Sequence, residues 1–158
     1  MLTAIDIQLR LLEQNDLDFL YTVENDESLW EFGSENRKYT KEELTQYISN
    51  AKQDILLAKQ SRFVIEYNSK VIGFIDLFDY DEFKASVGVL IVKEYQNRGF
   101  AKQALLLLIN HAFKILNITQ LCCSIHKTNI ASISLFTSCK FKFMKEEKNF
   151  NYYYLNNE

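Results

Sequence analysis

The sequence contains no proline and only four glycines among its 158 residues. Linkers and low-complexity segments are rich in these two residue types, and no such segment or internal repeat interrupts the chain. A chain of this length can bury most of its apolar surface in one hydrophobic core. We therefore interpret residues 1–158 as a single domain.

Cysteine is scarce as well: Cys122 and Cys123 are adjacent, and Cys139 stands apart. An odd number of cysteines, without a C-x-x-C pair or accompanying histidines at ligand spacing, argues against a disulfide framework and against a zinc site. The sequence thus predicts no metal centre. It predicts small, buried thiols in a reducing compartment.

Long apolar runs are absent too, since no stretch approaches the roughly 18 residues that a membrane-spanning helix requires. The first 19 residues have neither a basic start nor a cleavable apolar segment. The sequence therefore predicts a cytoplasmic protein without a membrane partner.

The charges divide unevenly between the two halves of the chain. Residues 1–82 carry 17 acidic and 8 basic side chains, a balance of −9, whereas residues 83–158 carry 4 and 10, a balance of +6. This asymmetry indicates an anionic ligand on the second half and a cationic one on the first. Two solvated faces of opposite sign explain it equally well.

Hydrophobic periodicity switches between strand-like and helical stretches along the chain. It predicts strands over residues 5–11, 62–67, 71–78, 85–92, 121–125, 141–146 and 150–155. It predicts helices after Asn15 and Asp16, after a capping box of Thr40 and Glu43, from Gly99 to Leu116, and after Thr128 or Asn129. This order predicts an α/β fold, with a mixed, mostly antiparallel central sheet and helices on both faces.

Residues 96–101 lie between the strand over 85–92 and the long helix. That strand is nearly all apolar, which predicts that it is covered on both faces of the sheet. A helix start presents several unpaired N–H groups and the positive end of the helix dipole, which together favour a phosphate. Gly99 permits a close backbone approach, and Arg98 adds positive charge. One glycine at a helix start is more often part of an ordinary strand-to-helix turn. The spacing fits neither a dinucleotide fingerprint nor a P-loop.

In these six residues, Gln-Asn-Arg-Gly-Phe-Ala, the chain resembles the Q/R-x-x-G-x-G/A signature of the GNAT acetyltransferase superfamily. The apolar run at 87–92 is similar to the strand that this family places before the signature. Residues 129–141 are similar to its later N-x-x-S and L-Y-x-x-x-G-F helix, and residues 9–17 resemble the L-R-x-L-x-x-x-D-L start of its polyamine and ribosomal-protein branch. The resemblance covers nearly the whole chain.

The resemblance implies a single GNAT-like domain that binds acetyl-CoA as co-substrate. Backbone groups of Leu90, Ile91 and Val92 are expected to pair with the pantetheine arm. The pyrophosphate is expected on Gln96, Asn97, Arg98, Gly99, Phe100 and Ala101, and the rest of the CoA arm on Asn129 and Phe136. A neutral amine then attacks the thioester directly, which requires a base, a donor to the oxyanion and a proton for the leaving thiolate.

Three positions depart from the family pattern. Phe136 replaces the tyrosine that often protonates the thiolate, and a phenyl ring has no proton to give. Ser86 falls near the usual carboxylate base and is itself no strong base. Lys140 replaces the glycine of the G-F pair, which predicts a different turn there.

Several residues are candidates for the missing roles. For catalysis we consider Asp76, Ser86 and His126, although a strand-end histidine often has no role. Trp30, Glu31, Asp79 and Glu82 are candidates for binding a cationic acceptor, although a packed loop and a solvated acidic hairpin explain them as well.

The sequence therefore predicts an acetyl-CoA-dependent N-acetyltransferase that acetylates a primary amine, with a polyamine-like acceptor favoured. The α-amino group of a protein N-terminus is the alternative acceptor. A catalytically silent acyl-CoA-binding module and a general anion-binding regulator are the alternatives to an enzyme. The lysine-rich stretch 140–148 on an acidic protein gives poor support for a nucleic-acid partner. Whether the chain forms a homo-oligomer is left open.

Overall fold

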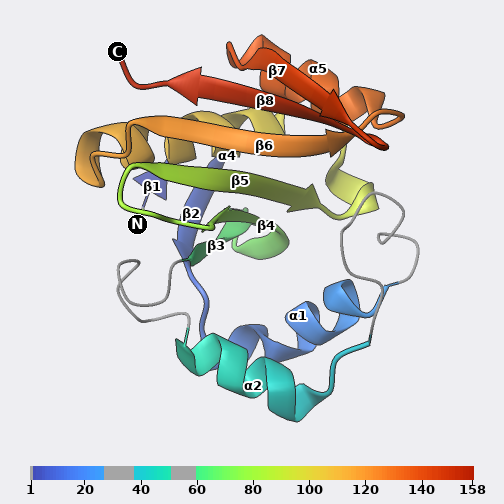
Figure 1. Cartoon of the computed structure of the whole chain (residues 1–158). Coiled ribbons are helices and arrows are strands. Elements are labelled where there is room, and N and C mark those ends of the chain that lie inside the picture. The colour runs from blue at the N-terminus through green and yellow to red at the C-terminus, as the bar shows by residue number, and fades with distance from the viewer. Residues whose placement is uncertain (1, 27–37, 51–59) are drawn as a thin grey trace.

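The computed structural model describes residues 2–26, 38–50 and 60–158. In this part of the chain, eight strands form one sheet in the order β1-β2-β3-β4-β5-β6-β8-β7 (Figure 1). Every neighbouring pair is antiparallel except β5 and β6, which run in the same direction. The mixed, mostly antiparallel sheet predicted from the sequence is thereby confirmed.

The strands are β1 (Leu2–Thr3), β2 (Ile7–Leu11), β3 (Ser61–Tyr67), β4 (Lys70–Phe78), β5 (Lys84–Ile91), β6 (Gln120–His126), β7 (Lys142–Glu147) and β8 (Phe150–Asn156). The helices are α1 (Leu17–Glu24), α2 (Lys41–Asn50), α4 (Phe100–Asn110) and α5 (Ile130–Ser138), with short helical turns η1 (Gln14–Asp16), η3 (Lys93–Tyr95) and η4 (His111–Ile115). The turn η4 continues α4 as a π-helix, so the predicted helix over 99–116 ends in a wider turn.

Helices cover both faces of the sheet, as predicted (Figure 1). Leu105 and Leu108 of α4 and Phe136 of α5 belong to the larger core cluster, on one face. Leu20 of α1 and Ile48 of α2 belong to the second cluster, on the other face. Since side chains alternate along a strand, neighbouring residues of β3 and β4 supply opposite clusters.

The β3–β4 hairpin shows how local sequence positions the sheet. Asn68 and Ser69 both have positive φ values, 49° and 65°, as the two central residues of a type I′ hairpin turn require. Further along β4, Gly73 lies against the backbone carbonyl of Leu90 on β5, so closely that a Cβ atom there would overlap it. The glycine therefore allows β4 and β5 to approach where β5 reaches its carboxyl end.

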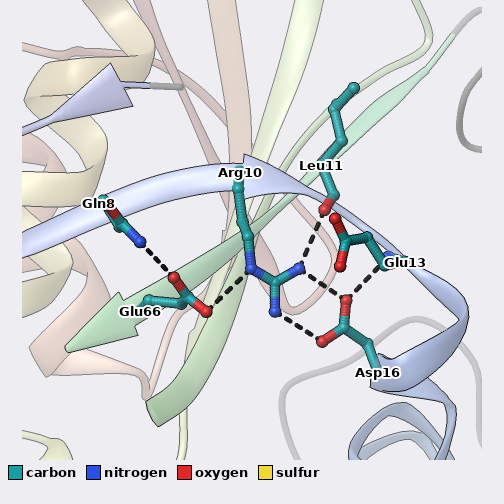
Figure 2. Close-up of polar contacts among 6 residues, drawn as sticks. All are labelled: Gln8, Arg10, Leu11, Glu13, Asp16 and Glu66. Carbon is teal, nitrogen blue, oxygen red and sulfur yellow. Dashed lines mark hydrogen bonds and ion pairs between the residues drawn. The ribbon is translucent and has the colours of Figure 1, made fainter. Parts of the chain in front are cut away.

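The connection from β2 to α1 is held by a network around Arg10, shown in Figure 2. The guanidinium donates from Nη1 to Asp16 Oδ2 and from Nη2 to Asp16 Oδ1, both at 2.8 Å, and from Nε to Glu66 Oε2 at 2.9 Å. Asp16 also accepts from the backbone N–H of Glu13, and its side chain is only 4% exposed. Asp16 thus joins two elements and makes no side-chain cap of α1, contrary to the sequence prediction.

Other details of the sequence prediction were also wrong. The first long strand begins at Ile7, and Ile5 is 97% exposed in a bend after the short strand β1, which was not predicted. Strand β5 is not buried on both faces, because Ser86 and residues 88–90 are only half-buried.

The prediction that Lys140 causes a different turn after α5 was wrong as well. Lys140 has φ 74°, the left-handed conformation that glycine favours. The N–H of Phe141 donates to Phe136 and that of Lys140 to Thr137, and the rings of Phe136 and Phe141 meet edge to face at 5.0 Å. These are the bonds and the apolar contact of a Schellman motif. The lysine therefore does not change the conformation that a glycine would adopt here.

The capping box of α2 is confirmed, since the N–H of Glu43 donates to Thr40 Oγ1 at 3.1 Å and the N–H of Thr40 donates to Glu43 Oε1 at 3.2 Å. Cys123 and Cys139 are buried and Cys122 is half-buried, all as free thiols. Within the described ranges, no helix is long and apolar enough to cross a bilayer.

Candidate functional site

The parallel strands β5 and β6 are paired over only a short stretch. Residues 84–86 pair with residues 120–122, whereas β5 continues to Ile91 and β6 to His126. In the described structure, residues 87–91 of β5 therefore have a partner on the β4 side alone. We call these five residues the open edge of β5.

The register of the sheet decides which backbone groups this edge presents. The N–H of Val92 donates to the carbonyl of Ile72 at 2.9 Å, and residues facing β4 recur with a period of two. Leu90 and the N–H of Val92 therefore face β4, whereas the carbonyl of Val92 accepts from the N–H of Tyr95. The backbone groups of Val89 and the N–H of Ile91 point away from β4, and the Ile91 carbonyl accepts from Gln96. Of the three residues predicted to pair with the pantetheine arm, Ile91 therefore has an N–H on the open side, and so does Val89, which the sequence did not single out.

The loop after β5 turns the chain sharply into α4. Gln96 Nε2 donates to the carbonyl of Ile91 at 2.8 Å, which closes the turn around η3. Asn97 and Gly99 then adopt left-handed φ values of 62° and 84°, and Phe100 begins the helix.

The start of α4 meets the chemical requirements of an anion site. Gly99, at the N-cap, supplies no side-chain hydrogen bond to the first-turn N–H groups, and the first turn contains no acidic residue. Residues 96–99 are exposed. A Cβ atom built on Gly99 would have no heavy atom within 4 Å, so the space above the turn is open. Exposed donors at the positive end of a helix are what a phosphate binds.

The helix α5 contributes from the other strand. Asn129 follows β6 and caps α5, its Oδ1 accepting from the N–H of Ser132 at 3.2 Å. The capping role predicted for Asn129 is therefore confirmed. Phe136 lies about two turns further on and is only 3% exposed, so its ring belongs to the core.

The predicted catalyst Asp76 is held in a partly buried ion-pair network. Arg62 on β3 donates from Nε and Nη2 to the two oxygens of Asp76 and from Nη1 to Glu24 on α1, each at 2.7 Å. Its guanidinium also lies over the rings of Tyr47 and Phe74. Burial opposes the charge of Arg62, but the carboxylates outweigh it and raise its pKa further. With both oxygens bound to Arg62, Asp76 is poorly suited to accept a proton from a substrate.

The remaining candidates lie at separate places. Ser86 stands where the β5–β6 pairing ends, opposite Cys122. His126 ends β6, its Nδ1 2.8 Å from Thr128 Oγ1 and its ring edge-on to Phe150. Asp79 and Glu82 are exposed, with positive φ values, in the turn between β4 and β5. Trp30 and Glu31 lie outside the described residues.

Sequence reasoning missed Arg62 and Glu24 altogether. Arg62 and Asp76 are cross-strand neighbours on β3 and β4, and Glu24 reaches them from a helix. The acidic and basic residues were visible in the sequence, but their pairing depends on a register that the sequence does not state. The described residues contain no cluster of histidine, cysteine or carboxylate groups that could bind a metal.

Comparison with known proteins places this geometry in a family. The chain is 26% identical over 143 residues to the spermidine N(1)-acetyltransferase of Escherichia coli K12, covering 89% of this chain and 75% of that protein. It is 26% identical over 138 residues to the Vibrio cholerae enzyme of the same name, covering 85% and 78%.

Solved structures share the fold. A V. cholerae spermidine N-acetyltransferase in complex with CoA and spermine superposes with a TM-score of 0.86 at 21% identity, covering 96% of each chain. The ribosomal-protein alpha-N-acetyltransferase RimL, in complex with CoA, gives 0.85 at 15% identity, covering 97% of this chain and 95% of that one. Residues 6–142 match the acetyltransferase (GNAT) domain family. The chain therefore belongs to the GNAT family of acetyltransferases.

Proposed function

We propose that this protein transfers the acetyl group of acetyl-CoA to a primary amine of a small polycation such as spermidine. The observation that carries the proposal is the open edge of β5, which leads directly into an uncapped, exposed helix start. The 26% identity to spermidine N(1)-acetyltransferases favours the polyamine as acceptor.

The residues present suit acetyl-CoA. The backbone groups of Val89 and the N–H of Ile91 are oriented to hydrogen-bond an extended amide-containing arm. The N–H groups of residues 97–101 suit its pyrophosphate, and the Asn129 amide and the start of α5 would contact the rest of the CoA arm. When bound, acetyl-CoA supplies an acyl group activated as a thioester. The protein's own task is to hold that group still beside the acceptor and to move protons.

Proton transfer requires a different residue from the tyrosine of the family pattern, because Phe136 is a buried phenyl ring. Asp76 is occupied by Arg62, and the Ser86 hydroxyl is too weak a base at neutral pH. We therefore propose His126 as the proton carrier, since an imidazole has one nitrogen that can accept a proton while the other donates one. The Arg62 network would hold α1 against β3 and β4.

An acceptor panel tests the proposed function. Free thiol released from acetyl-CoA is measured with spermidine, with a neutral amine of similar size and with a peptide bearing a free N-terminus. We expect kcat/KM to be highest for spermidine and to fall as salt rises, because the Debye length shrinks from about 10 Å at 0.1 M to about 3 Å at 1 M. Preference for the peptide would favour the alternative acceptor. Binding of acetyl-CoA without turnover on any amine would favour a silent acyl-CoA-binding module.

The acidic turn between β4 and β5 provides a second test. Replacing both Asp79 and Glu82 by their amides removes two exposed negative charges, so KM for spermidine is expected to rise about fivefold through weaker electrostatic attraction. KM for the neutral amine is expected to stay unchanged. The matched control is Glu146→Gln with Glu147→Gln, two exposed carboxylates on the edge strand β7. Equal effects of the two double variants would show that only net charge matters.

Self-association and location belong to the same proposal. One structure of the V. cholerae spermidine N-acetyltransferase is described as dodecameric, which supports a homo-oligomer here. Light scattering on the purified protein measures this directly. A cytoplasmic location, where acetyl-CoA is available, stays a prediction.

A further inference from the structure

Three aromatic rings from separate elements meet next to the exposed residues 96–99 of the loop. Tyr67 ends β3, Tyr95 lies in η3, and Phe100 begins α4. The ring centroids of Tyr67 and Phe100 are 4.6 Å apart, and that of Tyr95 is 6.1 Å from Tyr67 and 6.4 Å from Phe100. We call these three residues the Tyr67 cluster.

The guanidinium of Arg98 lies over this cluster. Its central carbon is 5.5 Å from the centroids of Tyr67 and Tyr95 and 5.1 Å from that of Phe100. All three distances are within the range of cation–π attraction. A guanidinium held near aromatic rings by cation–π attraction can still direct N–H donors toward a phosphate.

The loop itself has few other restraints. Residues 96–99 are exposed, and two of them hold left-handed backbone conformations. Phe100 is 4% exposed and packs on Tyr67. An arginine in solution samples many rotamers, and ordering them on binding weakens affinity. The Tyr67 cluster restricts them before any ligand arrives.

We propose that Tyr67 is a positioning residue for acetyl-CoA, acting through Arg98 and Phe100 to preset the phosphate-binding loop. Tyr67 lies nearly thirty positions before the loop and outside every sequence signature considered above. The inference rests on the proposed acetyl-CoA site and adds to it a residue that determines affinity without belonging to the loop.

The test compares Tyr67→Leu, which removes the ring, with Tyr67→Phe, which keeps it. Tyr67→Leu is expected to raise KM and the calorimetric dissociation constant for acetyl-CoA about tenfold, equivalent to about 1.4 kcal/mol. The value of kcat and KM for the amine are expected to stay unchanged, and Tyr67→Phe to match the wild type. The control is Tyr152→Leu, another half-buried strand tyrosine with a cation, Lys145, 5.0 Å from its ring. It is expected to leave acetyl-CoA affinity unchanged.

A double-mutant cycle with Arg98→Met tests whether Tyr67 acts through Arg98. If it does, adding Tyr67→Leu to Arg98→Met weakens acetyl-CoA binding no further, except for the loss of affinity that comes from the contact between Tyr67 and Phe100. Fully additive losses would overturn this route. Should Tyr67→Leu fail to fold, Arg98→Lys keeps the charge without the flat stacking face, and an undiminished affinity would overturn the inference.

The two proposals fail in different ways. Unchanged affinity in Tyr67→Leu, with a wild type that binds acetyl-CoA, would overturn the positioning role alone. A wild type that does not bind acetyl-CoA would overturn the proposed function and this inference with it.

Discussion

Replacing Gly99 by valine is expected to abolish acetyl-CoA binding while the protein stays folded. Gly99 has φ 84°, where a β-branched residue is strained by about 1–2 kcal/mol. No heavy atom lies within 4 Å of a Cβ built there, so the unliganded structure has room for the side chain. The valine methyl groups would stand over the exposed start of α4, where the pyrophosphate is proposed to lie.

Calorimetry with acetyl-CoA measures this loss, expected to exceed about a hundredfold, or 2.7 kcal/mol. The matched control is Lys148→Val, which places the same residue at another left-handed position, φ 55°, in the exposed β7–β8 turn. It reproduces the backbone strain without covering the loop, so binding should persist. Full affinity in Gly99→Val would refute the placement of the pyrophosphate on residues 96–101.

The second large effect concerns stability. Asp16→Ala is expected to lower the free energy of unfolding by about 3–5 kcal/mol. The substitution leaves the part-buried guanidinium of Arg10 without its bidentate carboxylate partner and the N–H of Glu13 without its acceptor. Asp18→Ala is the control. That carboxylate is 90% exposed and its contact with Lys41 is long, 3.5 Å, so a change below about 0.5 kcal/mol is expected.

The same substitution should alter the response to acid. Burial pushes the pKa of Asp16 upward, but the hydrogen bonds from Arg10 and from the Glu13 N–H outweigh it, so the folded-state pKa is lower than usual. A carboxyl group with a lowered folded-state pKa contributes stability above its unfolded pKa of about 4, and this is lost as pH falls through the folded value. Urea unfolding between pH 7 and 3 should therefore show a shallower loss for Asp16→Ala than for the wild type. Parallel curves would assign the acid sensitivity to other groups.

Sequence reasoning succeeded where the signal was local. The capping box of α2 and the Asn129 cap of α5 depend on residues three positions apart, and both are present. It failed where distant segments meet. Asp76 was considered for catalysis because the sequence does not show that Arg62 binds it. The two residues are fourteen positions apart, and their pairing can be identified only from the strand register. The orientation of the open edge of β5 depends on register in the same way, so the sequence did not distinguish Val89 from its neighbours Leu90 and Val92.

The short parallel contact between β5 and β6 also has a consequence for folding. The two antiparallel parts of the sheet, β1 to β5 and β6 to β7, meet only where residues 84–86 pair with residues 120–122, across the crossover that contains α4. Pairing across this crossover closes a loop, which costs conformational entropy. The open edge of β5 and the start of α5 come together only at that step, so partly folded chains lack a complete binding site. A ligand held there would therefore be a selective stabiliser of the native state, and it would raise the midpoint of unfolding with the logarithm of its concentration once that exceeds the dissociation constant.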